Sequence, residues 1–144
     1  MTTGFNILRL YNGRERKGQG MNLVDSCGWL EYLADGPNAG FFAGPLENQE
    51  KLLVPTICIT EVFKRVLQQR GEDAALHAAA IMQQGNVVDL DSAIAVEAAR
   101  LGYKHSIPLA DGIILATAYT HKAAIWTQDA DFKGLKDVKY KEKQ

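Results

Sequence analysis

Five acidic residues share one property: each stands just after a short apolar run or in the first turn of a helix predicted behind one. They are Asp25, Glu61, Asp111, Asp129 and Asp131. None of these positions pairs a nucleophile with a histidine. Two carboxylates about 4 Å apart repel by roughly 4 kcal/mol at an effective dielectric of 20, so a cluster of them must bind protons or a cation. Because Mg²⁺ and Mn²⁺ suit carboxylate and water oxygens, these acids predict a divalent metal site.

Other common sites are missing from the sequence. The three histidines, His77, His105 and His121, are scattered, and there is no HxxxH or CxxC spacing for zinc. The chain also has no GxGxxG and no GxxxxGK[ST], which argues against a dinucleotide-binding fold and a P-loop. The five acidic residues are therefore the best candidates for a functional site in this sequence.

Each acid alone also has an ordinary structural explanation. Asp25 could cap the helix that follows it, and Glu61 and Asp111 could lie in first turns, where the helix dipole favours negative charge by roughly 0.3–1 kcal/mol. Asp129 and Asp131 could form turns. The joint occurrence of carboxylates at four separate elements favours a site over these alternatives.

Short apolar runs alternate with longer helical patterns, which determines where these acids lie. Strands are predicted at 21–24, 51–55, 86–90, 123–126 and 138–140. Helices are predicted at 26–34, around 41–42, at 60–70, 72–84 and 92–101, and from Pro108 onward. In the helix at 92–101, the inward residues would be Ile94, Ala95, Ala98 and Leu101. This alternation predicts an α/β fold in which helices cover both faces of a mostly parallel sheet. Chemistry in such sheets collects at the carboxyl ends of the strands.

Composition predicts one globular domain inside the cell. The 144 residues suit a single domain, which would bury about two-thirds of the surface of the unfolded chain. Apolar runs are too short for a membrane span, and no signal peptide opens the chain, so we expect a cytoplasmic protein. Cys27 and Cys58 are expected to be buried, reduced thiols. Sixteen basic and 17 acidic residues give a net charge of −1, which argues against binding nucleic acid by bulk charge.

The first 20 residues differ from the rest. They carry four basic residues and one acidic residue, and they end in Gly18-Gln19-Gly20 just before Met21. We expect residues 1–20 to be a translated leader or added extension and 21–144 to form the domain. The alternative is a native basic arm. The mass of the protein made from its own promoter distinguishes the two, because a mass that includes Met1 contradicts the leader.

Four segments of the chain resemble the PIN-domain family, and within it the VapC-type toxins of prokaryotic toxin–antitoxin pairs. The segments are Val24-Asp25-Ser26, Thr60-Glu61-Val62, residues 108–118 (PLADGIILATA) and residues 127–132 (TQDADF). The resemblance runs from about Met21 to Tyr140, and the Pro-Leu-Ala-Asp helix start is its most specific part. It implies a three-layer α/β/α fold, a Mg²⁺-dependent ribonuclease, a homodimer and inhibition by a VapB-like antitoxin, with larger toxin–antitoxin assemblies as a further expectation.

The resemblance also assigns roles to the acids. By matching motifs, Asp25, Glu61 and Asp111 take the first three acidic positions as catalytic metal ligands. Asp129 takes the fourth and Asp131 is the aspartate before the phenylalanine, and which of these two is the fourth ligand stays open. Ser26 and Thr127 would hydrogen-bond the ligand carboxylates or bound water.

Because the chain as a whole is not basic, RNA would have to be bound by a few basic side chains close to the acids. Lys64, Arg65 and Lys104 are the candidates near the acids, whereas the lysines from 133 to 143 read as a solvated tail.

Two other functions remain as alternatives. One is a phosphoacceptor signalling domain, which needs adjacent acids after the first strand and a lysine after the fifth, and this spacing is missing. The other is a catalytically silent PIN-fold module that binds RNA or organises an assembly. Retention of four acidic positions argues against a silent module, and a metal titration would discriminate.

Overall fold

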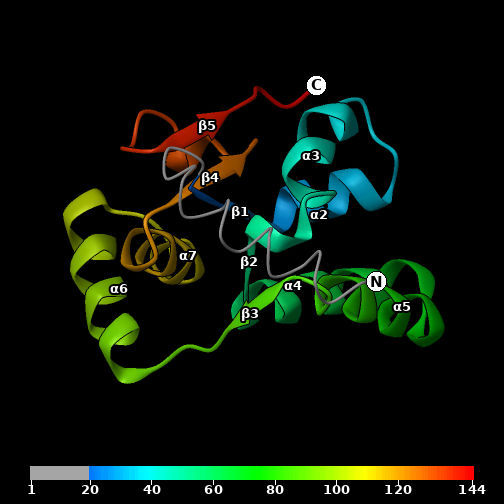
Figure 1. Ribbon diagram of the computed structural model, residues 1–144, viewed down its shortest axis with the longest axis horizontal. Coiled ribbons are helices and arrows are strands. Elements are labelled where there is room, and N and C mark those ends of the chain that lie inside the picture. The colour runs from blue at the N-terminus through cyan, green and yellow to red at the C-terminus, as the bar shows by residue number, and fades with distance from the viewer. Residues whose placement is uncertain (1–19) are drawn as a thin grey trace, which may run out of the picture.

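The computed structural model describes residues 20–144, so the predicted leader lies outside the described residues except for Gly20. A five-stranded sheet forms the centre of the domain (Figure 1), with the order β3-β2-β1-β4-β5. The strands are β1 (Met21–Val24), β2 (Leu52–Pro55), β3 (Asn86–Val88), β4 (Ala123–Thr127) and β5 (Val138–Tyr140). Every neighbouring pair is parallel. All five carboxyl ends therefore point to one edge of the sheet.

Helices cover both faces of this sheet. They are α2 (Ser26–Leu33), α3 (Ala39–Leu46), α4 (Thr56–Arg70), α5 (Glu72–Met82), α6 (Ser92–His105) and α7 (Leu109–Thr120). In Figure 1, α2 to α5 lie on one side of the strands and α6 and α7 on the other. This arrangement follows from the topology: the chain moves one way across the sheet from β1 to β3 and the other way from β3 to β5, and right-handed crossovers then change face. The predicted three-layer α/β/α fold is confirmed.

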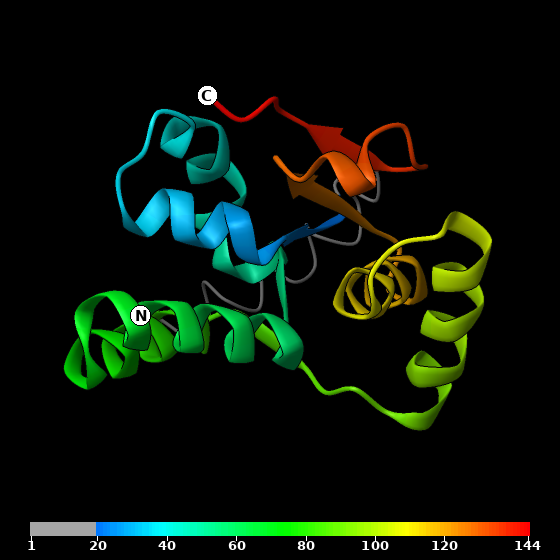
Figure 2. The same ribbon diagram turned by 180° about the vertical axis from the view of Figure 1, so that it is seen from behind.

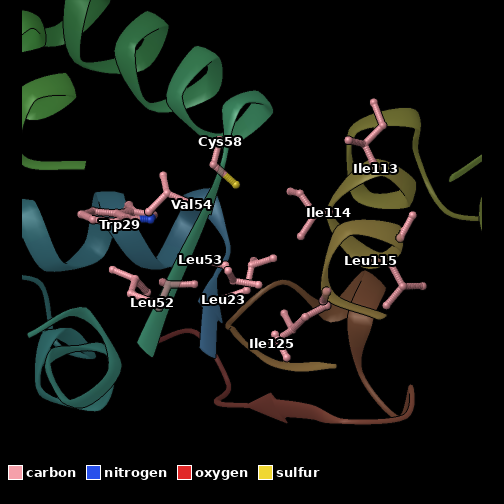
Figure 3. Close-up of a cluster of buried hydrophobic side chains, with 14 of the residues drawn as sticks. Leu23, Trp29, Leu52, Leu53, Val54, Cys58, Ile113, Ile114, Leu115 and Ile125 are labelled. Atoms are coloured by element: carbon pink, nitrogen blue, oxygen red, sulfur yellow. The ribbon is translucent and has the colours of Figure 1, made fainter. Parts of the chain in front are cut away.

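The core forms where the central strands meet the helices. Leu23 of β1 lies in register with Leu53 of β2 and Ile125 of β4, and all three side chains are buried. Figure 3 shows Ile114 of α7 directed toward this layer, with Trp29 of α2 on the other side. A strand that is buried on both faces has a continuous run of apolar residues in its sequence. Strand β2 (Leu52–Pro55) is an example, and all four of its residues are buried. This packing fixes the positions at which each strand ends.

Several boundaries differ from the sequence prediction: β3 ends at Val88 rather than at residue 90, and α6 continues to His105 beyond its predicted end at Leu101. Helix α4 begins at Thr56, directly after β2, rather than at Thr60. The β-branched residues of 56–60 favour an extended chain locally, but burial of Cys58 and Val62 on one helical face outweighs that preference. In α6, Ala95 is exposed instead of buried, because the inward stripe runs through Ile94, Ala98 and Leu101.

The first turn of α7 lies close against α6. A Cβ atom at Gly112 would meet the carbonyl oxygen of Ala98 at 2.9 Å, so only glycine allows this approach. Gly112 follows Asp111 directly, and the close contact therefore helps to fix where the Asp111 carboxylate lies. Among the helices of residues 20–144, none combines the length and the apolar character needed to cross a bilayer.

Candidate active site

The predicted acids meet at the edge formed by the carboxyl ends of the strands. Asp25 directly follows β1, Asp129 follows β4, and Glu61 lies in the helix that continues β2. Because β1 lies between β2 and β4, these residues follow three neighbouring strands of the sheet. The chain leaves β1 toward β2 and returns on its other side as β4, so the edge beside β1 is the switch point at which such sheets bind ligands.

Asp25 is buried at this edge with only 4 % of its surface exposed. It occupies the N-cap position of α2, but its side chain makes no capping hydrogen bond. Instead its Oδ2 accepts a hydrogen bond from Thr127 Oγ1 at 2.7 Å and one from Cys27 Sγ at 3.3 Å. The carboxylate therefore faces the neighbouring strand, and helix capping does not explain it.

Glu61 is held by the residue next to Asp25. Ser26 Oγ donates a hydrogen bond to Glu61 Oε1 at 2.6 Å. Since α4 begins at Thr56, Glu61 lies in its second turn, beyond the reach of the stabilisation that a first-turn acid receives from the helix dipole. The contact with Ser26 accounts for its position.

Asp111, Asp129 and Asp131 form a compact group. Each offers one carboxylate oxygen, and these oxygens lie within 4.8 Å of one another. Asp129 Oδ1 accepts a hydrogen bond from the backbone N–H of Asp131 at 2.9 Å, and the N–H of Asp129 donates to Thr127 Oγ1 at 2.8 Å. Thr127 thus connects this group to Asp25, and both Asp129 and Asp131 remain close enough to act as ligands.

Burial and mutual repulsion raise the pKa of two of these carboxyls. Burial raises the pKa of Asp25, repulsion from Asp129 and Glu61 adds to this, and the hydrogen bonds from Thr127 and Cys27 oppose it. The pKa of Asp111 is raised from 3.8 to about 8, first by burial and then by the charges of Asp129 and Asp25. Without a counter-charge, Asp111 therefore retains a proton near neutral pH.

A divalent cation fits this donor set. In residues 20–144, none of the five carboxylates forms an ion pair with a lysine, arginine or histidine. The oxygens available are carboxylates, which Mg²⁺ and Mn²⁺ prefer, and Asp131 and part of Asp111 are open to water. A bound cation would replace the proton on Asp111 and remove the repulsion.

The predicted basic residues do not all lie near the acids. Lys64 and Arg65 are exposed on α4, one turn beyond Glu61. Lys104 instead lines a hollow with Met21 and Ala123, which begin β1 and β4 at the opposite end of the sheet. The prediction that Lys104 lies near the acids is wrong because α6 runs back from the carboxyl end of β3, so its last turn lies toward the amino ends of the strands.

Two features of the site were missed by the sequence analysis. Cys58 is buried as predicted, but Cys27 is only half-buried because it lies at the open edge of the sheet beside Asp25. Burial together with the Asp25 charge raises the pKa of the Cys27 thiol to about 12, so it stays protonated and can donate to Asp25. Behind the Asp129 loop, buried Gln128 accepts a hydrogen bond from Asn38 Nδ2 at 2.8 Å, and the N–H of Asn38 donates to Glu31 Oε2. The place of Cys27, two residues after Asp25, was a usable signal, whereas nothing in the sequence links Gln128 to Asn38.

The chain shows clear likeness to known proteins. A family model described as the PIN domain matches residues 23–138. A search of curated proteins finds no significant match.

Several solved structures share the fold. A chain of a toxin–antitoxin complex from Klebsiella pneumoniae is 22 % identical, with a TM-score of 0.69 over 82 % of this chain and 95 % of that chain. VapC20 of Mycobacterium tuberculosis, a sarcin–ricin loop cleaving toxin, is 17 % identical, with a TM-score of 0.68 over 81 % and 95 %. FitAcB of Neisseria gonorrhoeae is 24 % identical, with a TM-score of 0.62 over 83 % and 96 %. At these identities, the likeness concerns the fold.

Proposed function

The chain belongs to the PIN-domain family, and we propose that it is a metal-dependent endoribonuclease that hydrolyses phosphodiester bonds in RNA. We further propose that it acts in the cytoplasm as the toxin of a VapBC-type toxin–antitoxin pair. The observation that carries the proposal is the convergence of five carboxylates at one sheet edge, without a basic partner among the described residues. Such a site would hold the Mg²⁺ that a metal-dependent nuclease requires, with Mn²⁺ as a substitute.

The chain's own residues prepare this site in three ways. Hydrogen bonds from Thr127 and Cys27 favour the ionised form of Asp25 despite its burial. Ser26 orients Glu61, and the N–H of Asp131 orients Asp129, so the ligand oxygens are fixed before a cation binds. Burial and the charges of Asp129 and Asp25 raise the pKa of Asp111 to about 8, so this carboxyl would exchange its proton for the cation.

The bound cation would activate a water molecule and stabilise the leaving oxygen of the phosphodiester. Asp25, Glu61, Asp111 and Asp129 are the proposed ligands, with Asp131 as a further one. Lys64 and Arg65 are exposed one turn beyond Glu61, where they can contact RNA phosphates on the way to the acids.

The toxin role rests on the family and on the names of its structural neighbours. One neighbour is a toxin–antitoxin complex, and another is named as a toxin that cleaves the sarcin–ricin loop. We propose a VapB-like antitoxin as the partner of this chain, and a homodimer as its assembly. The antitoxin would insert a basic side chain, such as arginine, among the acids, because a guanidinium pairs carboxylates bidentately and competes with the cation. Adding antitoxin should then weaken Mg²⁺ binding, and independent binding of both would count against this mode of inhibition.

The test in cells is a brief induction of the chain followed by sequencing of RNA 5′ ends. New 5′ ends at defined positions should appear with the wild-type chain and be absent with Asp25→Asn. The silent-module alternative is tested on purified protein by calorimetric titration with Mg²⁺. Saturable binding supports the nuclease, whereas no heat of binding together with no new 5′ ends favours the silent module.

A further inference from the structure

The hollow that Lys104 lines lies at the end of the sheet opposite to the acids. It has a volume of about 860 Å³, in the range of sites that hold ligands. Its walls include Met21 and Ala123, which begin β1 and β4, together with parts of α6 and α7 and the loop before β5. In Figure 2 the arrowheads of β4 and β5 point away from α6, so the amino ends of these strands face the side on which α6 lies.

Basic side chains gather around this hollow from separate parts of the chain. They are Lys104, His105, Lys122, Lys136 and Lys139, and the acid among the described lining residues is Asp137. Lys104, Lys122 and Lys136 are exposed, and within residues 20–144 none of them forms an ion pair, not even with Asp137. The acids of the candidate site therefore lie at one end of the sheet and these unpaired lysines at the other. An unneutralised basic hollow attracts anions.

Tyr119 adds an aromatic surface to the same hollow. Its ring is half-buried in the wall, and its hydroxyl donates a hydrogen bond to the carbonyl of Lys136 at 2.9 Å. This contact fixes the ring and also the loop that carries Lys136. Cations beside an aromatic ring are the chemistry that binds single-stranded nucleic acid, because the cations hold the phosphates and a base stacks on the ring.

We propose that this hollow binds the phosphodiester backbone of the RNA substrate at a distance from the bond that is cut. The inference rests on the proposed ribonuclease function and names where that substrate is held. Without a cation the cluster of carboxylates repels RNA, and Lys64 and Arg65 are the only cations proposed beside it, so further affinity would come from contacts away from the acids. Contacts to remote phosphates supply that affinity and orient the strand without reading its sequence.

The test measures RNA binding without cleavage. Fluorescence anisotropy with a labelled single-stranded RNA in EDTA, at several salt concentrations, compares the wild type with Lys104→Gln/Lys122→Gln. Losing two phosphate contacts should raise Kd by about tenfold and reduce the slope of log K against log salt by about 1.4. The matched control is Lys51→Gln/Arg70→Gln, which removes the same charge outside the hollow and should bind nearly as well as the wild type.

A second pair of variants tests the aromatic wall. Tyr119→Ala should weaken binding of the RNA, whereas Tyr119→Phe keeps the ring and should bind more tightly than Tyr119→Ala. Thermal melts confirm that each variant is folded, and Lys136→Gln replaces the double variant if that one is not. An unchanged Kd in the folded hollow variants overturns the proposal. An equal loss of RNA affinity in the Lys51→Gln/Arg70→Gln control also contradicts the proposal. Full displacement of RNA by inorganic phosphate at equal ionic strength contradicts it too, because it indicates a site for small ions only.

Cleavage assays with Mg²⁺ separate this inference from the function on which it rests. If the function holds, Lys104→Gln/Lys122→Gln should raise KM for RNA and leave kcat unchanged. If this double variant cleaves RNA with an unchanged KM, the proposal that the hollow binds RNA is wrong, and the proposed ribonuclease function is unaffected. If the wild type binds RNA through the hollow in EDTA but does not cleave it with Mg²⁺, the proposed ribonuclease function is wrong. The proposal that the hollow binds RNA is then still supported.

Discussion

Thr127 Oγ1 donates a hydrogen bond to Asp25 Oδ2 at 2.7 Å, which joins the last residue of β4 to the residue that follows β1. The same oxygen accepts from the backbone N–H of Asp129 at 2.8 Å. One hydroxyl therefore stabilises the charge of a buried carboxylate and fixes the loop that carries a second one. Removing a side chain that hydrogen-bonds and orients a metal-ligating carboxylate typically weakens metal affinity by about 10–100-fold.

Thr127→Val should therefore weaken Mg²⁺ binding by roughly 10–100-fold. Valine keeps the shape of the side chain but removes the hydroxyl, so the pKa of Asp25 should rise further. Thr127→Ser should restore binding. Thr117→Val is the matched control, because its buried hydroxyl donates only to Ile113 within α7. Calorimetric titration measures all three, and equal affinities for the Thr127→Val and Thr117→Val variants would contradict a role for Thr127 in the site.

The raised pKa of Asp111 makes the stability of the metal-free protein depend on pH. The unfolded chain releases this proton near pH 3.8, whereas the folded protein keeps it until about pH 8. Between these values the folded state binds more protons than the unfolded state, so its stability falls as the pH rises. Melting temperatures in EDTA should be lower at pH 8 than at pH 6, and added Mg²⁺ should raise the value at pH 8.

Asp111→Asn should flatten this pH dependence and leave the metal-free variant at least as stable as the wild type at pH 8. Asn has no charge to be repelled by Asp129 and Asp25. Asp89→Asn, at an exposed acid before α6, is the control and should keep the wild-type dependence. A metal-free wild type whose melting temperature rises between pH 6 and pH 8 would argue against the acid cluster as described.

Asp91 provides the opposite case, an acid with a purely structural role. Its Oδ1 accepts a hydrogen bond from the N–H of Ile94 at 2.9 Å, which caps α6. Asp91→Ala should lower the free energy of unfolding by about 0.5–2 kcal/mol. RNA cleavage and Mg²⁺ affinity should not change at a temperature where the variant is folded. Denaturant unfolding and titration measure the two effects, and a loss of Mg²⁺ affinity in the folded variant would show that caps and site acids cannot be separated in this way.

The sequence predicted the sheet and the convergence of acids because these follow from local rules. Apolar runs of strand length alternated with helical periodicity, and parallel strands must end at one edge, which brings Asp25 and Asp129 together. The start of α4 was misplaced because the β-branched residues after Pro55 give no helical signal, and burial of Cys58 decides the outcome.

Other features depend on packing between distant segments. Lys104 lies at the amino ends of the strands because α6 runs back from β3 and continues to His105, beyond its predicted end at Leu101, and this position becomes visible only once the helix is packed on the sheet. The same holds for the lysines near the C-terminus: Lys136 reads as part of a solvated tail, yet it lines a hollow with residues of α6 and α7. The hydrogen bond between Asn38 and Gln128 spans 90 residues of sequence, so only the folded structure reveals it. The prediction of a leader at residues 1–20 remains a prediction.

The central claim is that the acids at the carboxyl edge of the sheet hold a cation that cuts RNA. The most direct measurement is RNA cleavage by the purified wild type and Asp111→Asn, each with Mg²⁺ and with EDTA, under conditions in which thermal melts show both proteins folded. The wild type should cleave with Mg²⁺ and not with EDTA, and Asp111→Asn should be slower by orders of magnitude although its fold is intact. Cleavage by Asp111→Asn at the wild-type rate, or wild-type cleavage that persists in EDTA, would contradict the proposed site.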